Sequence, residues 1–247
     1  MRKMVKKTLW GLGILILLVV ILFVWYGIRA KSETKKMNPA ETGQLTDSIY
    51  AIKDSFVNLY LIKSGNSYVA IDAGNSVDAV IQGLNKLRIC PDNVVAVLLT
   101  HTDGDHVAAL KLFSKASVYI SKQEEKMING EVSRFLFFGN SLNGRAYTTL
   151  EDNQELNILN IKVKGILVPG HTEGSMCFVV NDTFLFTGDA LSLKNGKVDK
   201  FNKLFNMDSE MAAKSMDKLT NLPNVKYIFT AHHGYTNDYS TAFNNFK

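Results

Sequence analysis

The sequence predicts an α/β fold in which two mixed β-sheets pack together with helices outside, preceded by one transmembrane helix. Short apolar runs and amphipathic stretches alternate in both halves of the chain, which is typical of packed sheets covered by helices. Metal-ligand residue types follow four of the apolar runs, and a separate long apolar segment lies near the N-terminus. These three observations define the expected architecture.

The N-terminal segment, residues 1–36, consists of a charged tip, an apolar run and a charged flank. Residues 8–28, between Lys7 and Arg29, carry no charge and have a tryptophan near each end. At about 1.5 Å per residue this run spans the roughly 30 Å hydrocarbon core of a bilayer. The apolar region of a cleaved signal peptide is usually only about 7–15 residues long. We therefore expect an uncleaved membrane anchor.

The net positive charge of the chain lies on this segment. Residues 1–36 carry eight Lys or Arg and one acid, so the formal net charge of +5 leaves the remainder slightly acidic. No nucleic-acid partner is therefore expected. The α-amino group and Glu33 tilt the charge balance toward a cytoplasmic N-terminus, which predicts a single-pass membrane protein with its domain outside the cytoplasm.

The rest of the chain is expected to form a linker, residues 37–45, and one folded domain, residues 46–247. In the first half of the domain, apolar positions at helical spacing predict helices over 77–87 and 107–113. A hairpin turn is predicted at Ser64-Gly65-Asn66. The predicted strands span residues 48–53, 56–63, 67–72, 94–99 and 117–120.

In the second half, Asn181-Asp182 predicts a hairpin turn and Asp208 is a candidate cap for a helix over residues 209–219. Residues 122–150 are the least regular part of the domain. Their aromatic residues would form either a substrate wall or ordinary packing, and they include Phe135, Phe137 and Phe138. The predicted strands of this half span residues 156–168, 175–181, 183–186 and 224–230.

Candidate metal ligands gather directly after the predicted strands. The loop after the strand 94–99 contains His101, Asp103, Asp105 and His106, and the ends of three later strands supply His171, Asp189 and His232-His233. Imidazole nitrogen and carboxylate oxygen suit divalent cations such as zinc, iron or manganese. A single loop histidine is usually an ordinary core or surface residue. Five histidines that all follow strand-like runs predict a metal centre.

In these motifs and their order, the chain resembles the metallo-β-lactamase superfamily over about residues 46–236. The motifs are Asp72-Ala73-Gly74, the loop 101–106, Gly170-His171-Thr172, Gly188-Asp189 and the terminal His232. The resemblance implies an αββα four-layer sandwich with the metal site at one edge. Asp189 stands where some lactamases of this family have a cysteine. The resemblance therefore favours the thioesterase-like and lactonase-like branches over the branches that hydrolyse β-lactams.

The resemblance also implies two divalent ions, in this family most often zinc. His101, Asp103 and His171 would hold one ion and Asp105, His106 and His232 the other, with Asp189 between them and His233 as the alternative to His232. Asp103 departs from the family motif, which has a histidine at this position. Its anionic oxygen either favours harder ions such as manganese or iron(II), or weakens the first site so that only one ion binds.

The resemblance finally implies a membrane-anchored hydrolase that acts on an ester, thioester, lactone or phosphoester of a small molecule, through a hydroxide that bridges the two ions. Asp105 would be both a ligand and the catalytic proton carrier. Asp72 would either orient a metal-bound histidine or simply form a turn. Two alternatives stay open: a mononuclear iron enzyme like the persulfide dioxygenases, and a non-catalytic metal-binding domain at the membrane.

Overall fold

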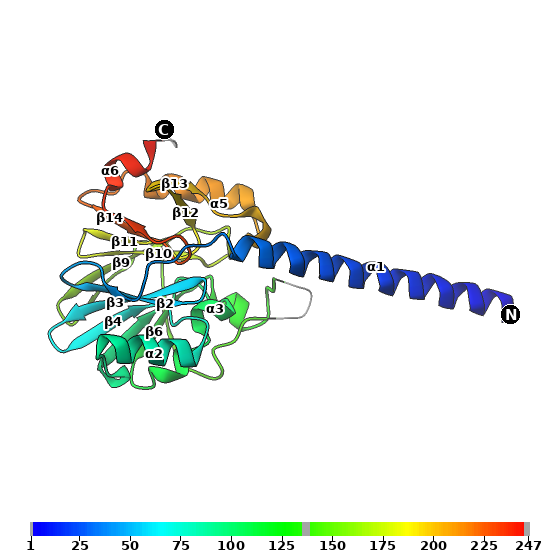
Figure 1. Ribbon diagram of the computed structural model, residues 1–247, viewed down its shortest axis with the longest axis horizontal. Coiled ribbons are helices and arrows are strands. Elements are labelled where there is room, and N and C mark those ends of the chain that lie inside the picture. The colour runs from blue at the N-terminus through cyan, green and yellow to red at the C-terminus, as the bar shows by residue number, and fades with distance from the viewer. Residues whose placement is uncertain (1, 135–138, 245–247) are drawn as a thin grey trace. The chain divides into compact units, whose positions relative to one another are not determined.

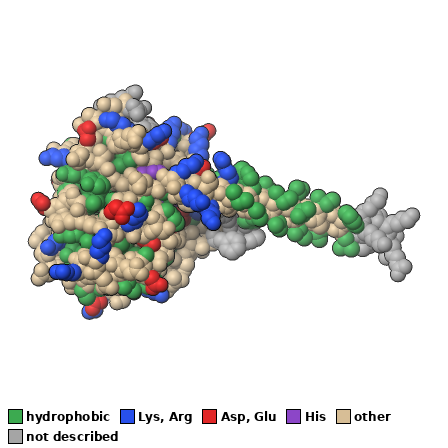
Figure 2. All heavy atoms as spheres, viewed as in Figure 1, with side chains coloured by type: hydrophobic (Ala, Val, Ile, Leu, Met, Phe, Trp, Pro, Cys, Tyr) green, Lys and Arg blue, Asp and Glu red, His purple; other side chains and the backbone are tan. Residues whose placement is uncertain are grey.

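The computed structural model describes residues 2–134 and 139–244 and divides into two compact units, residues 1–37 and 38–247. The first unit is the continuous helix α1 (Arg2–Thr34), which Figure 1 shows in blue. Its segment Leu9–Thr34 reaches a mean hydropathy of 2.7, and hydrophobic side chains line its surface in Figure 2. The helix is long and apolar enough to cross a membrane, a property that anchors share with signal sequences.

The first sheet of the second unit contains, within the described residues, seven strands in chain order. The strands are β1 (Gly43–Gln44), β2 (Ile49–Asp54), β3 (Val57–Ser64), β4 (Ser67–Ile71), β5 (Val94–Leu98), β6 (Ser117–Ser121) and β7 (Thr148–Leu150). Strands β1 to β4 pair antiparallel, whereas β4, β5, β6 and β7 pair parallel. Strands β4 and β5 therefore end at the same edge of the sheet.

The second sheet has six described strands in the order β15-β14-β11-β10-β9-β8. They are β8 (Glu155–Ile158), β9 (Ile161–Leu167), β10 (Met176–Val180), β11 (Phe184–Phe186), β14 (Tyr227–Phe229) and β15 (Tyr235–Thr236). Strand β10 is antiparallel to both β9 and β11, and β11 is parallel to β14. Strands β9, β11 and β14 therefore run in one direction and end at one edge. A separate hairpin joins β12 (Leu191–Lys194) and β13 (Lys197–Lys200).

Buried apolar side chains form three layers of core. On β3, Leu59 and Leu61 pack with the outer helix α2 (Val77–Leu87), while Tyr60 and Ile62 pack against the second sheet. This alternation follows from the two-residue period of a strand whose two faces are both covered. The third core lies between the second sheet and the C-terminal helices. Figure 1 shows the resulting order of helix, sheet, sheet and helix, so the predicted αββα sandwich is confirmed.

The structure confirms two predicted helices, one over residues 77–87 and one that begins at residue 209 after the predicted cap Asp208. Helix α2 has the predicted bounds, and the Ser76 side chain accepts from the backbone N–H of Ala79 at its start. Asp208 accepts from two backbone N–H groups at the start of α5 (Ser209–Ser215). The other described helices are α3 (Gly104–Val107), α4 (Glu125–Ile128), α6 (Tyr239–Ala242), and the 3₁₀ turns η1 (Pro91–Asn93), η2 (Leu110–Leu112), η3 (Lys203–Phe205) and η4 (Met216–Leu219).

Two predicted elements were wrong. The helix expected over 107–113 is instead the short α3, which begins at Gly104, followed by η2, because the metal-ligand loop itself turns into the first helical turn. The strand expected over 156–168 is two strands, because the chain reverses at Leu159, whose φ is +57° and whose apolar side chain is exposed. Phe135, Phe137 and Phe138 lie outside the described residues.

Candidate metal centre

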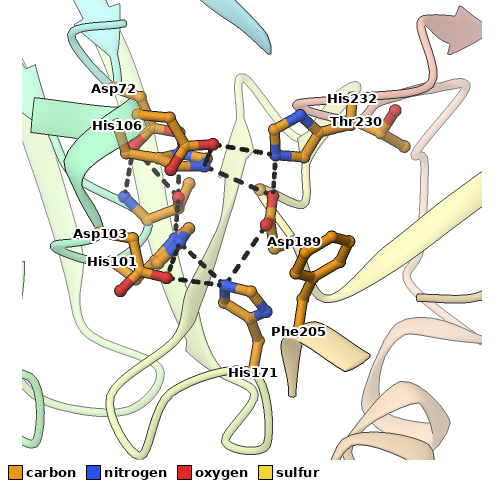
Figure 3. Close-up of polar contacts among 12 residues, drawn as sticks. Asp72, His101, Asp103, His106, His171, Asp189, Phe205, Thr230 and His232 are labelled. Atoms are coloured by element: carbon orange, nitrogen blue, oxygen red, sulfur yellow. Dashed lines mark hydrogen bonds and ion pairs between the residues drawn. The ribbon is translucent and has the colours of Figure 1, made fainter. Parts of the chain in front are cut away.

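The candidate ligands leave strands that end at one edge of the two sheets, as Figure 3 shows. Their positions follow from the strand directions, because the two sheets bring the carboxyl ends of β4, β5, β9, β11 and β14 together. All seven candidate ligands fall into overlapping groups whose ligand atoms lie within 4.8 Å of one another: His101, Asp103, Asp105, His106, His171, Asp189 and His232. His232, and not His233, belongs to these groups.

We call Asp105, His106 and His232 the Asp105 cluster. The Nε2 atom of His106 lies 3.7 Å from Asp105 Oδ2 and 3.5 Å from Asp189 Oδ1. The Nε2 atom of His232 lies 3.5 Å and 3.1 Å from the same two oxygens. Ligand atoms of a tetrahedral zinc ion are about 3.4 Å apart. These four residues are therefore spaced as the ligands of one ion would be.

The two imidazoles of the Asp105 cluster are held by their other nitrogen. His106 Nδ1 lies 2.9 Å from Asp72 Oδ2, and His232 Nδ1 lies 2.7 Å from the carbonyl oxygen of Phe56. Both partners are acceptors, so each Nδ1 carries a proton and each Nε2 faces the cluster, as in metal-binding histidines generally. The Nε2 atom of His106 is buried and has no hydrogen-bond partner among the described residues. A metal ion would satisfy this atom, so the residues fit one.

Asp72 combines the two roles that the sequence left open. Its φ of +62° places it in a turn after β4, and its side chain is buried. Its carboxylate accepts from the backbone N–H of Thr100 at 2.7 Å and from the Thr100 hydroxyl, in addition to His106. The turn therefore places a carboxylate where it orients His106.

We call His101, Asp103 and His171 the Asp103 cluster. The Nε2 atom of His171 lies 3.1 Å from that of His101, 3.2 Å from Asp103 Oδ2 and 3.3 Å from Asp189 Oδ2. This cluster already contains a cation of the protein, because the guanidinium of Arg134 lies against both Asp103 and His171. Arg134 was not predicted from the sequence, because it lies in the irregular segment 122–150 and belongs to no motif.

Glu124 was missed for the same reason. It is fully buried, and it accepts from the backbone N–H and hydroxyl of Thr102 and from the Thr172 hydroxyl, each at 2.7 Å. Burial raises the pKa of this carboxyl, although the hydrogen bonds oppose the shift. Gly174 packs so closely that a Cβ there would overlap the backbone of Glu124. Glu124 therefore joins the loop that carries His101 to the loop that carries His171.

Proton competition at His106 predicts that metal binding depends on pH. Burial lowers the pKa of His106, but the carboxylates of Asp72, Asp105 and Asp189 outweigh burial and raise the pKa from 6.5 to about 10. The metal-free protein therefore carries a proton on His106 at pH 7, and a metal ion must displace it. We expect release of about one proton per ion bound, and metal affinity that rises up to about tenfold per pH unit toward pH 10.

Calorimetry in two buffers of different ionisation enthalpy measures this proton release. Metal binding at pH 7 without proton release would show that His106 is neutral before the ion arrives.

The raised pKa of His106 also affects the stability of the metal-free protein. A histidine whose pKa is higher in the folded than in the unfolded state stabilises the fold below pH 6.5, and this contribution is lost as the pH rises toward about 10.

Comparison with known proteins agrees with this geometry. The model of the metallo-beta-lactamase superfamily matches residues 52–232. The chain is 27% identical over 189 residues to a hydroxyacylglutathione hydrolase of Pectobacterium atrosepticum, covering 75% of this chain and 64% of that protein. It is 30% identical over 132 residues to a probable polyketide biosynthesis zinc-dependent hydrolase of Bacillus velezensis, covering 52% of each.

Among solved structures, a metallo-beta-lactamase family protein from Thermus thermophilus superimposes with a TM-score of 0.65 at 18% identity, covering 83% of this chain and 79% of that one. This likeness shows a shared fold. The chain spans between about half and just under two thirds of the length of the first curated relatives that it matches.

Proposed function

Because the chain belongs to the metallo-β-lactamase superfamily, we propose that it is a metal-dependent hydrolase of an ester, thioester, lactone or phosphoester of a small molecule. The observation that carries the proposal is the Asp105 cluster together with Asp189, where two oriented imidazoles and two carboxylates converge at the spacing of metal ligands. A thioester is the first substrate class to test, since a hydroxyacylglutathione hydrolase is among the relatives.

The residues of the Asp105 cluster would hold a divalent ion, which supplies a water of lowered pKa and polarises the oxygen of the substrate. His106 and His232 offer the nitrogen ligands, and Asp189 offers an oxygen to each cluster. We assign proton transfer to Asp105, because its side chain is 23% exposed whereas that of Asp189 is 5% exposed. An exposed carboxylate beside the ion can reach both the substrate and bulk water.

Zinc is the ion that we propose. Two imidazole nitrogens suit it, and one relative is named as a zinc-dependent hydrolase. Manganese or iron(II), which Asp103 favours, stay predictions that elemental analysis of the purified chain tests. The predicted second ion would need the Asp103 cluster, where Arg134 already bonds to two of the three candidate ligands.

We further propose that helix α1 is an uncleaved membrane anchor and that the domain lies outside the cytoplasm. The length and apolar composition of Leu9–Thr34 support the anchor, and the proposed orientation rests on the charge balance of its two flanks. The full-length chain should fractionate with membranes, and protease added to intact spheroplasts should digest the domain. A mature protein whose N-terminus lies beyond residue 28 would contradict the anchor.

Metal removal tests the proposed hydrolase. The full-length chain, purified in detergent, should hydrolyse at least one member of a panel of thioesters, esters, lactones and phosphoesters. Dialysis against a chelator should lower that activity by about a hundredfold or more, and added zinc or manganese should restore it. Enzyme treated with chelator that was first saturated with zinc is the control. Activity that survives complete metal removal would contradict the proposal, and oxygen consumption with a persulfide would favour the iron alternative.

A further inference from the structure

The side chain of Arg134 lies inside the Asp103 cluster. Its Nε donates to Asp103 Oδ1 at 2.9 Å, and its Nη2 lies 2.6 Å from Asp103 Oδ2. This is the two-point pairing in which a guanidinium binds a carboxylate most strongly. The same Nη2 lies 2.7 Å from Nε2 of His171. Two of the three candidate ligands of this cluster are therefore already bonded to a cation.

The bond to His171 excludes a metal ion from the same nitrogen. A guanidinium has only donors, so Nε2 of His171 must be the acceptor. A neutral imidazole has a single lone pair on that nitrogen, and the lone pair cannot bind an ion while it accepts the N–H of Arg134. The contact and a metal ion at the Asp103 cluster are mutually exclusive.

The opposite nitrogen of His171 supports the same conclusion. Its Nδ1 is buried without a hydrogen-bond partner among the described residues, whereas Nδ1 of His106 and of His232 each face an acceptor. Metal-binding histidines almost always donate their second N–H to such an acceptor. The Asp105 cluster has this support and His171 does not.

Further hydrogen bonds fix Arg134 in its place. Its Nη1 donates to the carbonyl oxygen of Phe205 at 2.6 Å, and its Nη2 also lies 3.1 Å from the carbonyl oxygen of His171. Asn140 donates to Asp103 Oδ1 at 3.0 Å and holds that carboxylate toward the arginine. The guanidinium is thus tied to three separate segments of the chain.

The charges of the centre balance with one metal ion. Three carboxylates face the two clusters, those of Asp103, Asp105 and Asp189. One divalent ion and one guanidinium together neutralise these three charges. Two divalent ions beside the same guanidinium would leave two uncompensated positive charges in a largely buried site, which is unfavourable.

We propose that the guanidinium of Arg134 takes the place of a second metal ion, so that the chain binds one divalent ion, at the Asp105 cluster. The centre then keeps a fixed cation at the Asp103 cluster that does not depend on metal supply. This inference rests on the proposed metal centre and specifies its stoichiometry and the residue that sets it.

Zinc content measures this stoichiometry directly. The full-length chain in detergent is stripped with chelator, incubated with excess zinc, freed of unbound zinc by gel filtration and analysed for zinc per chain. We expect about one zinc in the wild type and about two in Arg134→Met, which keeps the length of the side chain but frees Asp103 and His171. Adding Asp103→Asn to that variant should return the content to about one.

Two further variants sharpen the test. Arg145→Met is the matched control. The Arg145 guanidinium donates to the carbonyl oxygens of Phe113, Ser114 and Ala116. The zinc content of this variant should stay at one. Asp103→Asn alone should also stay at one, because Asp103 pairs with Arg134 and does not bind metal. This second variant keeps the test decisive if Arg134→Met does not fold.

Each outcome separates the two proposals. Two zinc ions in the wild type would overturn the role of Arg134 while leaving the metal centre intact. One zinc ion in both the wild type and a folded Arg134→Met would also overturn it, since the second ion would then be excluded by something else. No zinc in the wild type would overturn the metal centre itself, and with it the proposed hydrolase.

Discussion

Replacement of Asp189 by asparagine should remove zinc binding and hydrolysis together. Asp189 is the only described residue whose two oxygens face both clusters: Oδ1 lies 3.1 Å from His232 Nε2, and Oδ2 lies 3.3 Å from His171 Nε2. Burial raises the pKa of this carboxyl, but the imidazoles of His232 and His106 help to outweigh burial and hold the pKa well below its usual range. The side chain therefore offers anionic oxygens to both clusters.

The expected loss is large because an amide cannot replace this carboxylate. Asparagine removes the charge and turns one of the two oxygens into a donor, which would point at an imidazole nitrogen. Substitution of a residue that only supports a ligand lowers metal affinity about 10–100-fold. A ligand itself should exceed this, so we expect at least a hundredfold loss in zinc affinity and in kcat/KM on the substrate identified by the panel.

Asp152→Asn is the matched control for Asp189→Asn. Asp152 also accepts from a backbone N–H, that of Leu167, and pairs with Lys218, but it contacts no histidine in the interactions described. It should keep zinc and activity. Full hydrolysis by Asp189→Asn would contradict the proposed centre. Intact cellular function in a variant without hydrolysis would favour the non-catalytic alternative.

Much of the fold could be predicted because its signals are local. The strands buried on two faces are short apolar runs, and the helix over 77–87 has an apolar stripe at helical spacing. The candidate ligands could be found because each follows a strand, and the ends of parallel strands meet. The choice of His232 over His233 followed from its distance to the preceding strand and stays a prediction, although His232 and not His233 belongs to the groups of close ligand atoms.

The parts that escaped prediction depend on contacts between distant residues. Arg134 is 31 residues from Asp103 and 37 from His171, and no local pattern connects them. Glu124 likewise acts only through two loops that the fold brings together. The chain reversal at Leu159 was not predicted, because an exposed leucine in a turn looks in the sequence like part of one continuous apolar strand. Sequence patterns indicate which residues are buried and how apolar residues are spaced along the chain, and neither determines which side chain enters a site.

Replacement of Asp72 by asparagine should weaken zinc binding without unfolding the turn. Asparagine has nearly the same shape and tolerates the left-handed φ of +62°. It has only one acceptor oxygen, however, while Asp72 uses Oδ1 for the Thr100 backbone N–H and Oδ2 for His106 Nδ1. If the amide oxygen stays with Thr100, the NH₂ group faces Nδ1 and forces the His106 proton onto Nε2, where the ion must bind.

We therefore expect zinc affinity to fall about 10–100-fold in Asp72→Asn, measured by competition with a chromophoric chelator. Asp54→Asn is the matched control. Asp54 is also buried and accepts from two backbone N–H groups, those of Asn75 and Ser76, but it contacts no histidine in the interactions described. It should lower the free energy of unfolding and leave zinc affinity unchanged. Wild-type zinc affinity in Asp72→Asn would mean that Asp72 only forms the turn, because nothing but the orientation of His106 connects it to the ion.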